Sequence, residues 1–395
     1  MKKQTLNNYV DTLILFFCGF IVFSPISSQI SINILHLPLA LPEVLFFPFY
    51  FKLRKLFNLK PNSKILFFGS FIIIFLIAIS LIVGLFPFTS ILSTARGYFY
   101  MLLVFSIFKN KMIPNINYIF YIVFGSSVAW MVIGMISLNR LISSTYQSGF
   151  SAVYGNMIAL ALMISITIIY KKKLLTFIAL GIAIVIALTS GLRRQISIAF
   201  ISYVLSFLTQ IRFSIKRIFY PSILIFVFAT AILFLYPVAM EFTYSTSSTL
   251  YTRIFVKTEQ LLTGQSNASD QTRLNSFHTF SDNIEDYILP RGFVSKRTMQ
   301  DKGTGLFMDS PYIEFFHTFG LFFSIPLIIY IFSRFKFHFK NYYRNKINES
   351  AINFVMAGVI FALMLIEGSF LNFAYTTPIT GFVFARIAST KNLVK

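Results

Sequence analysis

Long apolar runs separated by short polar segments recur along almost the whole chain, and this pattern predicts membrane-spanning helices. Each run holds about 17 to 22 residues, enough at 1.5 Å per residue to cross a hydrocarbon core of roughly 30 Å. The runs are continuous in Leu, Ile, Phe and Val, whereas the strands of a membrane barrel alternate apolar and polar residues. The predicted fold class is therefore an all-α polytopic integral membrane protein with about twelve transmembrane helices. The expected helices cover residues 10–29, 31–51, 65–85, 91–108, 116–138, 152–170, 174–190, 195–211, 218–240, 311–332, 350–370 and 373–389.

One long hydrophilic segment, residues 241–310, interrupts this pattern. It separates helices one to nine, within residues 1–240, from helices ten to twelve, within residues 311–395. We therefore expect a single membrane domain with one large inserted loop. The acidic and basic residues of the loop nearly balance, so it is not a polybasic tail, and its length favours a functional role over that of a connector.

Composition supports the membrane prediction, because 56% of the residues are apolar and only 12% are charged, too apolar a balance for a soluble protein of this size. A net charge of +21 would suggest nucleic-acid binding in a soluble protein. Here most basic residues stand at predicted helix ends, in the connections that share a side with the N-terminus. The positive-inside rule then predicts that both termini are cytoplasmic and that the large loop is outside. The expected partners are membrane lipids and not nucleic acid.

Two adjacent arginines, Arg193 and Arg194, follow Thr189-Ser190-Gly191-Leu192 at the predicted outer end of an apolar hairpin. Guanidinium groups bind phosphate through two parallel hydrogen bonds and stay charged close to lipid. Snorkelling of the two side chains to lipid headgroups explains their position equally well. Because lysine is scarce on this side of the membrane, the pair favours an anionic ligand.

A second polar group opens the predicted tenth helix. Ser310 as N-cap and Pro311 at the first helical position explain the local sequence without any function. They do not explain Glu314 and His317, which are three residues apart on one helix face where ionisable groups are costly and usually face a cavity or a partner. These two side chains either take part in the function of the protein or pair with each other for packing. Asp309 is either a plain cap or a base that accepts a hydroxyl proton.

The sequence offers little for a metal or a cofactor, and we expect neither. Its four histidines lack the spacing of an HExxH motif or of a paired-carboxylate site, and no Gly-rich nucleotide loop occurs. The only cysteine, Cys18, stands within the first predicted helix, so the chain forms no internal disulfide and no multi-cysteine metal site.

Together these elements resemble the Wzy-type polymerases of O-antigen and capsule repeat units and, more broadly, the O-antigen ligase and polymerase superfamily. The resemblance covers the architecture of the whole chain, with about a dozen helices and one large outer loop. The segment from Thr189 to Arg194 resembles the Arg-bearing T-G-S-R motif of that family, with a spacing shifted by a residue or two. Either Arg193 or Arg194 is the counterpart of the motif arginine.

The loop carries the remaining points of resemblance. Arg273 with Gly292 resembles the Arg-to-Gly element of the family, although eighteen residues intervene here. The segment Asp309-Ser310-Pro311-Tyr312-Ile313 with Gly320 resembles the final motif at the start of the next helix. Ligases of the superfamily carry histidine in place of Asp309, so aspartate favours a polymerase, while the nearby His317 keeps the ligase in consideration.

The resemblance implies a metal-independent, multi-pass glycosyltransferase of the bacterial cytoplasmic (inner) membrane. Such an enzyme joins undecaprenyl-pyrophosphate-linked oligosaccharide repeat units into O-antigen or capsular polysaccharide, and a chain-length regulator is a candidate partner. The expected catalytic residues are Asp309, Glu314 and His317. The expected pyrophosphate- and substrate-binding residues are Arg193, Arg194, Arg273, Arg291 and Tyr312.

The alternatives are an O-antigen ligase and a lipid-linked oligosaccharide flippase or other transporter. Glu43, after a proline in the second predicted helix, suits a transporter, because transporters use broken helices with charges at mid-membrane. The long outer segment 241–310 and the outer arginines favour the enzyme, because a transporter does not need them.

Overall fold

The computed structural model describes the greater part of the chain between residues 2 and 389. The described ranges are 2–24, 31–34, 37–84, 87–109, 115–142, 156–190, 193–210, 237–238, 240–241, 244–245, 251–256, 259, 263, 278, 280–293, 311–366 and 376–389. Most of the predicted ninth helix and most of the predicted large loop therefore lie outside the described residues.

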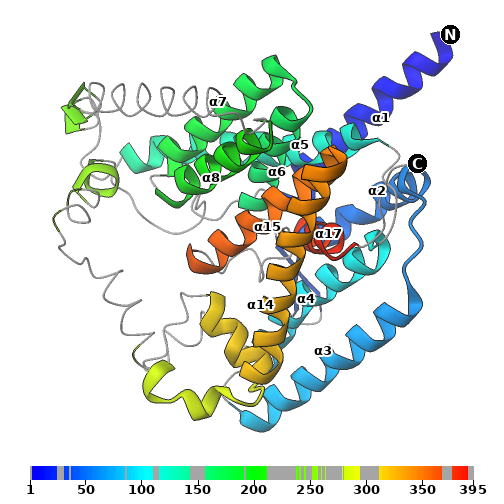
Figure 1. Cartoon of the computed structure of the whole chain (residues 1–395), viewed down its shortest axis with the longest axis vertical. Helices are drawn as coiled ribbons and strands as arrows, with labels where there is room; N and C mark the ends of the chain where they lie inside the picture. Colours follow the sequence, from blue (N-terminus) through cyan, green and yellow to red (C-terminus); the bar gives the residue numbers. More distant parts are fainter. Residues whose placement is uncertain are drawn as a thin grey trace.

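Helices form nearly all of the regular structure in these ranges (Figure 1). They are α1 Lys2–Ile21, α2 Leu41–Phe57, α3 Ser63–Val83, α4 Phe88–Phe108, α5 Ile116–Ile142, α6 Met157–Ile169, α7 Lys173–Ser190, α8 Arg193–Gln210, α14 Pro311–Asn345, α15 Asn348–Ile366 and α17 Thr377–Ala388, with a π-turn η2 Thr252–Val256 and a 3₁₀ turn η3 Ile284–Tyr287. Four of the described helices are long and apolar enough to cross a membrane: α3, α4, α5 over Ile116–Ile136, and α14 over Tyr312–Asn345. The chain is a helical membrane protein, as its apolar runs predict.

The prediction of a helix over residues 31–51 is wrong in its first half. Ser31–Ile34 (β1) and Leu37–Ala40 (β2) pair as an antiparallel hairpin, and α2 begins only after it. Pro42 suits the start of α2, because it stands in the first turn of the helix, where its missing N–H is not needed.

The prediction that the tenth helix ends at residue 332 is also wrong, because α14 continues to Asn345. The added turns contain basic residues expected in a connection, and Lys and Arg are good helix formers. Lys336 and Lys340 are exposed on this stretch, while His338 between them is 3% exposed. The last turns of α14 therefore present an outer face of lysine and aromatic side chains, among them Phe339 and Tyr343, and a buried inner one.

The helices α6 and α3 mark the centre and the periphery of the described bundle. Every residue of α6 is buried, and it packs against α5, α7, α8 and α15. In α3 the buried residues are Leu76 and Ser80, whereas the aromatic side chains Phe67, Phe68 and Phe71 are exposed. An apolar helix with so exposed a surface is suited to face lipid, and α3 lies along the edge of the molecule (Figure 1).

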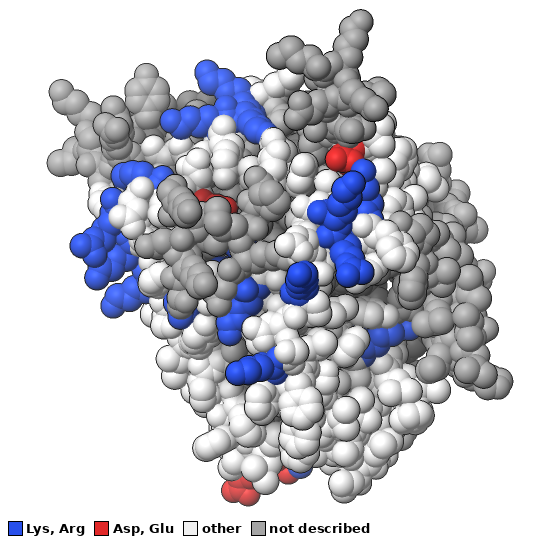
Figure 2. Space-filling view, turned by 90° about the vertical axis from the view of Figure 1, so that its right-hand side faces the viewer, with Lys and Arg blue, Asp and Glu red and all other residues white. Residues whose placement is uncertain are grey.

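The charged side chains are unevenly distributed along the bundle. On the face shown in Figure 2, Lys and Arg gather in the upper part, while the lower part is largely white with a few charged side chains at its bottom edge. Polar bonds join neighbouring segments on the basic side: Lys52 Nζ lies 2.5 Å from Asp11 Oδ1, and Lys172 Nζ donates to Asn117 Oδ1 at 2.5 Å. The start of α14 lies at the bottom of the view in Figure 1, away from the helix ends near the top.

Candidate active site

The segment Arg291–Gly292–Phe293 links the end of α3 to the start of α14. On the α3 side, the Phe293 N–H donates to Ser80 Oγ at 2.7 Å. On the α14 side, the Arg291 N–H donates to the His317 carbonyl at 2.9 Å, and His317 Nδ1 lies 3.3 Å from the Gly292 carbonyl. The loop and the two helices are therefore joined by hydrogen bonds from three consecutive residues.

Two glycines make this close approach possible. Gly292 has φ +84°, and a Cβ there would lie 2.1 Å from Ser80 Oγ. Gly320 has φ +74° within α14, and a Cβ there would lie 2.7 Å from the Ile288 carbonyl oxygen. Only glycine adopts such a backbone without strain, and only glycine fits these spaces. The sequence therefore allows the loop to pack into a bend of α14.

Among the described residues of this end, His317 is a deeply enclosed ionisable group, with 1% of its surface exposed. A carbonyl oxygen only accepts hydrogen bonds, so Nδ1 carries the proton in the bond to Gly292. In the neutral imidazole, Nε2 is then the acceptor. Nε2 has no hydrogen-bond partner among the residues that the structure describes.

Glu314 lies one turn before His317 on α14 and is 2% exposed. Its carboxylate acts electrostatically on Tyr98 of α4, whose side chain is 3% exposed. The Tyr98 ring packs on Phe293 at 5.2 Å and on Phe319 at 5.7 Å between ring centroids. A carboxylate, an imidazole and a phenol from two helices thus share one buried region.

Arg291, Asp286 and Tyr287 form the edge of this region. Arg291 Nη2 forms an ion pair with Asp286 Oδ1, and their side chains are 31% and 51% exposed. The Tyr287 ring lies 6.1 Å from the His317 ring, and its hydroxyl has no hydrogen-bond partner in the described part of the chain. Burial raises the pKa of Tyr287, the Arg291 guanidinium opposes that rise, and the Asp286 carboxylate adds to it. Tyr287 therefore remains a hydroxyl donor at neutral pH.

The structure brings together only some of the predicted site residues. Arg291, Glu314 and His317 meet in the region just described. The partly buried Tyr312 is on the same helix, with its ring 6.3 Å from that of Phe316. Asp309 and Arg273 lie outside the described residues.

The predicted arginine pair is placed by its backbone alone. Arg193 and Arg194 open α8, and their side chains are not among those described. In the described ranges α8 packs on α6, α7 and α15.

Sequence reasoning missed two residues of the region: Ser80 and Tyr98. Each stands among residues that form no recognisable motif. Tertiary contacts with distant segments bring it into the site. Serine in a membrane helix commonly bonds its own backbone, as Ser80 does to the Leu76 carbonyl at 2.7 Å, so the sequence gives no sign of its second bond.

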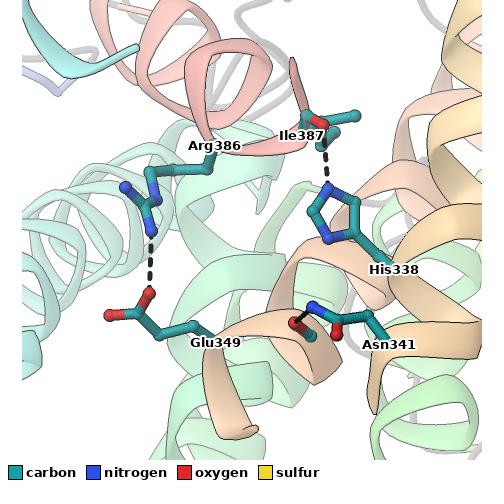
Figure 3. Close-up of polar contacts among 6 residues, drawn as sticks. His338, Asn341, Glu349, Arg386 and Ile387 are labelled. Atoms are coloured by element: carbon teal, nitrogen blue, oxygen red, sulfur yellow. Dashed lines mark hydrogen bonds and ion pairs between the residues drawn. The ribbon is translucent and has the colours of Figure 1, made fainter. Parts of the chain in front are cut away.

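A second polar cluster lies further along α14, toward its end (Figure 3). Arg386 of α17 and Glu349 of α15 form an ion pair at 2.8 Å, and the two side chains are 5% and 22% exposed. His338 Nε2 lies 2.8 Å from the Ile387 carbonyl, and Asn341 Nδ2 donates to Ser350 Oγ at 2.9 Å. The adjoining cavity is only about 20 Å³, room for about one water molecule. These bonds tie α14, α15 and α17 together and leave no space for a substrate.

Comparison with known proteins adds no relative: no protein-family model matches the chain, and no curated protein matches it. The chemistry of the site therefore carries the functional assignment. Two buried proton acceptors beside phenol groups, with a guanidinium at the edge, are suited to take a proton from a hydroxyl and to stabilise an anion.

Proposed function

We propose that this chain is a membrane glycosyltransferase that polymerises undecaprenyl-pyrophosphate-linked oligosaccharide repeat units on the outer face of the bacterial cytoplasmic membrane. The observation that carries the proposal is the convergence of Arg291, Glu314 and His317 at one end of the bundle, around a loop segment that both helices hold. The motif resemblance to Wzy-type polymerases supports the same activity.

The proposed topology has about twelve spans, two cytoplasmic termini and one large outer loop. It puts the site on the outer side. Two features support it: the exposed basic residues near the start of α3 and between α6 and α7, and the position of the site at the opposite end of α3. The substrate would then reach the site after its transfer across the membrane.

In the proposed reaction, an acceptor sugar hydroxyl attacks the anomeric carbon of the growing chain. The new C–O bond forms as the bond from that carbon to the pyrophosphate oxygen breaks, and the hydroxyl proton passes to a protein base. Glu314 and His317 Nε2 are the described candidates for that base, and Asp309 is the third.

The leaving pyrophosphate accumulates negative charge as the bond breaks. Guanidinium groups fixed nearby stabilise that charge as it develops. Arg291 would do so at the edge of the site, together with Arg193, Arg194 and Arg273, and Tyr312 would contact the substrate. In this reaction the arginine side chains supply the positive charge that stabilises the leaving pyrophosphate, and no cofactor takes part.

An O-antigen ligase is the second candidate, because it would use the same donor and the same buried base. The buried His317 is the observation that favours it, since histidine belongs to the presumed catalytic set of the ligases. The two enzymes differ in the acceptor: a lipid-linked repeat unit for the polymerase, and a membrane-anchored core for the ligase.

The test is the size profile of surface polysaccharide in a host strain that lacks this gene and in the same strain complemented with it. Single repeat units without a ladder, restored to a ladder on complementation, would establish the polymerase. Long chains that stay on the lipid carrier would establish the ligase. An unchanged profile would refute both enzymes and the flippase, and would leave a transporter of another substrate.

A further inference from the structure

Ser80 is a polar residue in a helix that otherwise faces outward with apolar side chains. Its hydroxyl is fully engaged: Oγ donates to the Leu76 carbonyl at 2.7 Å and accepts from the Phe293 N–H at 2.7 Å. The second bond joins positions 213 residues apart in the sequence. Ser80 is therefore the point at which α3 holds the loop.

The bond to Phe293 also bears on His317, because the Phe293 N–H and the Gly292 carbonyl belong to one peptide unit. A peptide unit is planar, and in the trans form its N–H and C=O point in opposite directions. Ser80 Oγ holds the N–H end of this plane, and the His317 ring lies against the carbonyl end at 3.3 Å. Rotation of the plane would weaken both contacts together.

The surroundings leave that plane little freedom. Gly292 has φ +84°, and the space beside its Cα is filled by Ser80 Oγ and by the Leu76 carbonyl oxygen. The neighbouring Arg291 N–H donates to the His317 carbonyl at 2.9 Å. The orientation of the Gly292 carbonyl is thus set jointly from α3 and from α14.

We infer that Ser80 is a positioning residue: through the Gly292–Phe293 peptide it holds His317 in the tautomer with the proton on Nδ1 and the lone pair on Nε2. The importance of this for catalysis rests on the proposed function, in which Nε2 is a candidate base. The inference about the tautomer itself rests only on the hydrogen bonds, because the Gly292 carbonyl can only accept a hydrogen bond, and Nδ1 is the ring nitrogen that lies against it.

The replacement of Ser80 by alanine removes the acceptor and leaves the buried Phe293 N–H without its partner, which costs free energy unless the loop moves. Ser80→Thr keeps a hydroxyl that bonds the preceding turn in the same way. Ser80→Cys keeps the volume but offers only a weak acceptor. These three variants separate the hydrogen bond from the packing.

The test is ¹⁵N NMR of histidine in the purified full-length protein, with the His317 signals assigned by their loss in His317→Gln. We expect one neutral tautomer, with the proton on Nδ1, in the native protein and in Ser80→Thr. We expect mixed tautomers in Ser80→Ala and Ser80→Cys. Ser165→Ala is the matched control, because Ser165 makes the same helical bond, to the Ala161 carbonyl at 2.7 Å, within α6. It should leave the His317 signals unchanged.

Polymer formation by the same variants separates this inference from the proposed function. Ser80→Ala and Ser80→Cys should lower the rate about tenfold, the effect of one buried hydrogen bond, and Ser80→Thr should restore it. An unchanged His317 tautomer in both Ser80→Ala and Ser80→Cys would overturn the positioning role, whatever happens to the polymer. Mixed tautomers in those variants, together with full polymer in His317→Gln, would support the positioning role and refute the proposed part of His317 in catalysis.

Discussion

The backbone N–H of Arg291 donates to the backbone carbonyl of His317 at 2.9 Å, so the main-chain positions that carry the guanidinium and the imidazole are held together. This bond depends on the bend in α14. Gly320 has φ 74° and ψ 156°, which interrupts the helical hydrogen-bond pattern three residues beyond His317. A carbonyl near such an interruption is available to a partner outside its own helix.

His317→Gln should abolish the polymer ladder, because loss of a general base typically lowers a rate by about 10² to 10⁴. His338→Gln is the matched control, since His338 is also buried in α14 but bonds the Ile387 carbonyl at 2.8 Å in the other cluster. The measurement is the polysaccharide profile of the complemented deletion strain at equal protein level. A full ladder in His317→Gln, or equal loss in both variants, would contradict the assignment.

Arg291→Ala should lower polymer formation by roughly tenfold or more with little loss of stability. Its ion pair with Asp286 is partly exposed, and pairs of that kind contribute about 0 to 1 kcal/mol. Asp286→Asn breaks the same pair and keeps the guanidinium, so it should retain the ladder. Thermal unfolding of the purified variants, measured beside the polysaccharide profile, checks both expectations. Equal loss of polymer in the two variants would show that the ion pair matters and not the charge of Arg291.

The parts of the fold that follow from local sequence were predictable. The apolar run of α3 sets its length, and Pro311 sets the start of α14. The hairpin before α2 was missed because apolar periodicity alone does not distinguish short strands from a helix. The last turns of α14 were missed because their Lys and Arg residues resemble those of a connecting loop.

The site could be predicted only as far as ionisable groups stand out in an apolar helix. Glu314 and His317 are costly there, so the sequence draws attention to them. Ser80 and Tyr98 cost little in a membrane helix, and their roles come from tertiary contacts with Phe293. A contact between segments so distant in the sequence leaves no pattern in the residues around either of them.

Gly320→Ala should destabilise the protein by about 1 to 3 kcal/mol, because alanine strains at φ 74° and its Cβ would lie 2.7 Å from the Ile288 carbonyl oxygen. Gly181→Ala is the control: a Cβ there meets nothing within 4 Å, and alanine favours the helix α7. It should leave stability unchanged or raise it slightly. Both are measured by thermal unfolding in one detergent. A Gly320→Ala protein as stable as Gly181→Ala would show that the bend in α14 is not required.

Arg386→Ala should destabilise the protein by about 3 to 5 kcal/mol, since it leaves the carboxylate of Glu349 in its half-buried place without the ion-pair partner at 2.8 Å. The double variant Glu349→Leu/Arg386→Met removes both charges and keeps apolar volume, so most of that stability should return. Lys52→Ala leaves the carboxylate of Asp11, 16% exposed, without its partner, so it should also destabilise the protein, for the same reason. Thermal unfolding of the purified proteins compares the stability of these variants. His317→Gln, which changes the other end of α14, is the reference. If the double variant is as unstable as Arg386→Ala, the cluster stabilises α17 through packing of the arginine stem, and the ion pair itself contributes little.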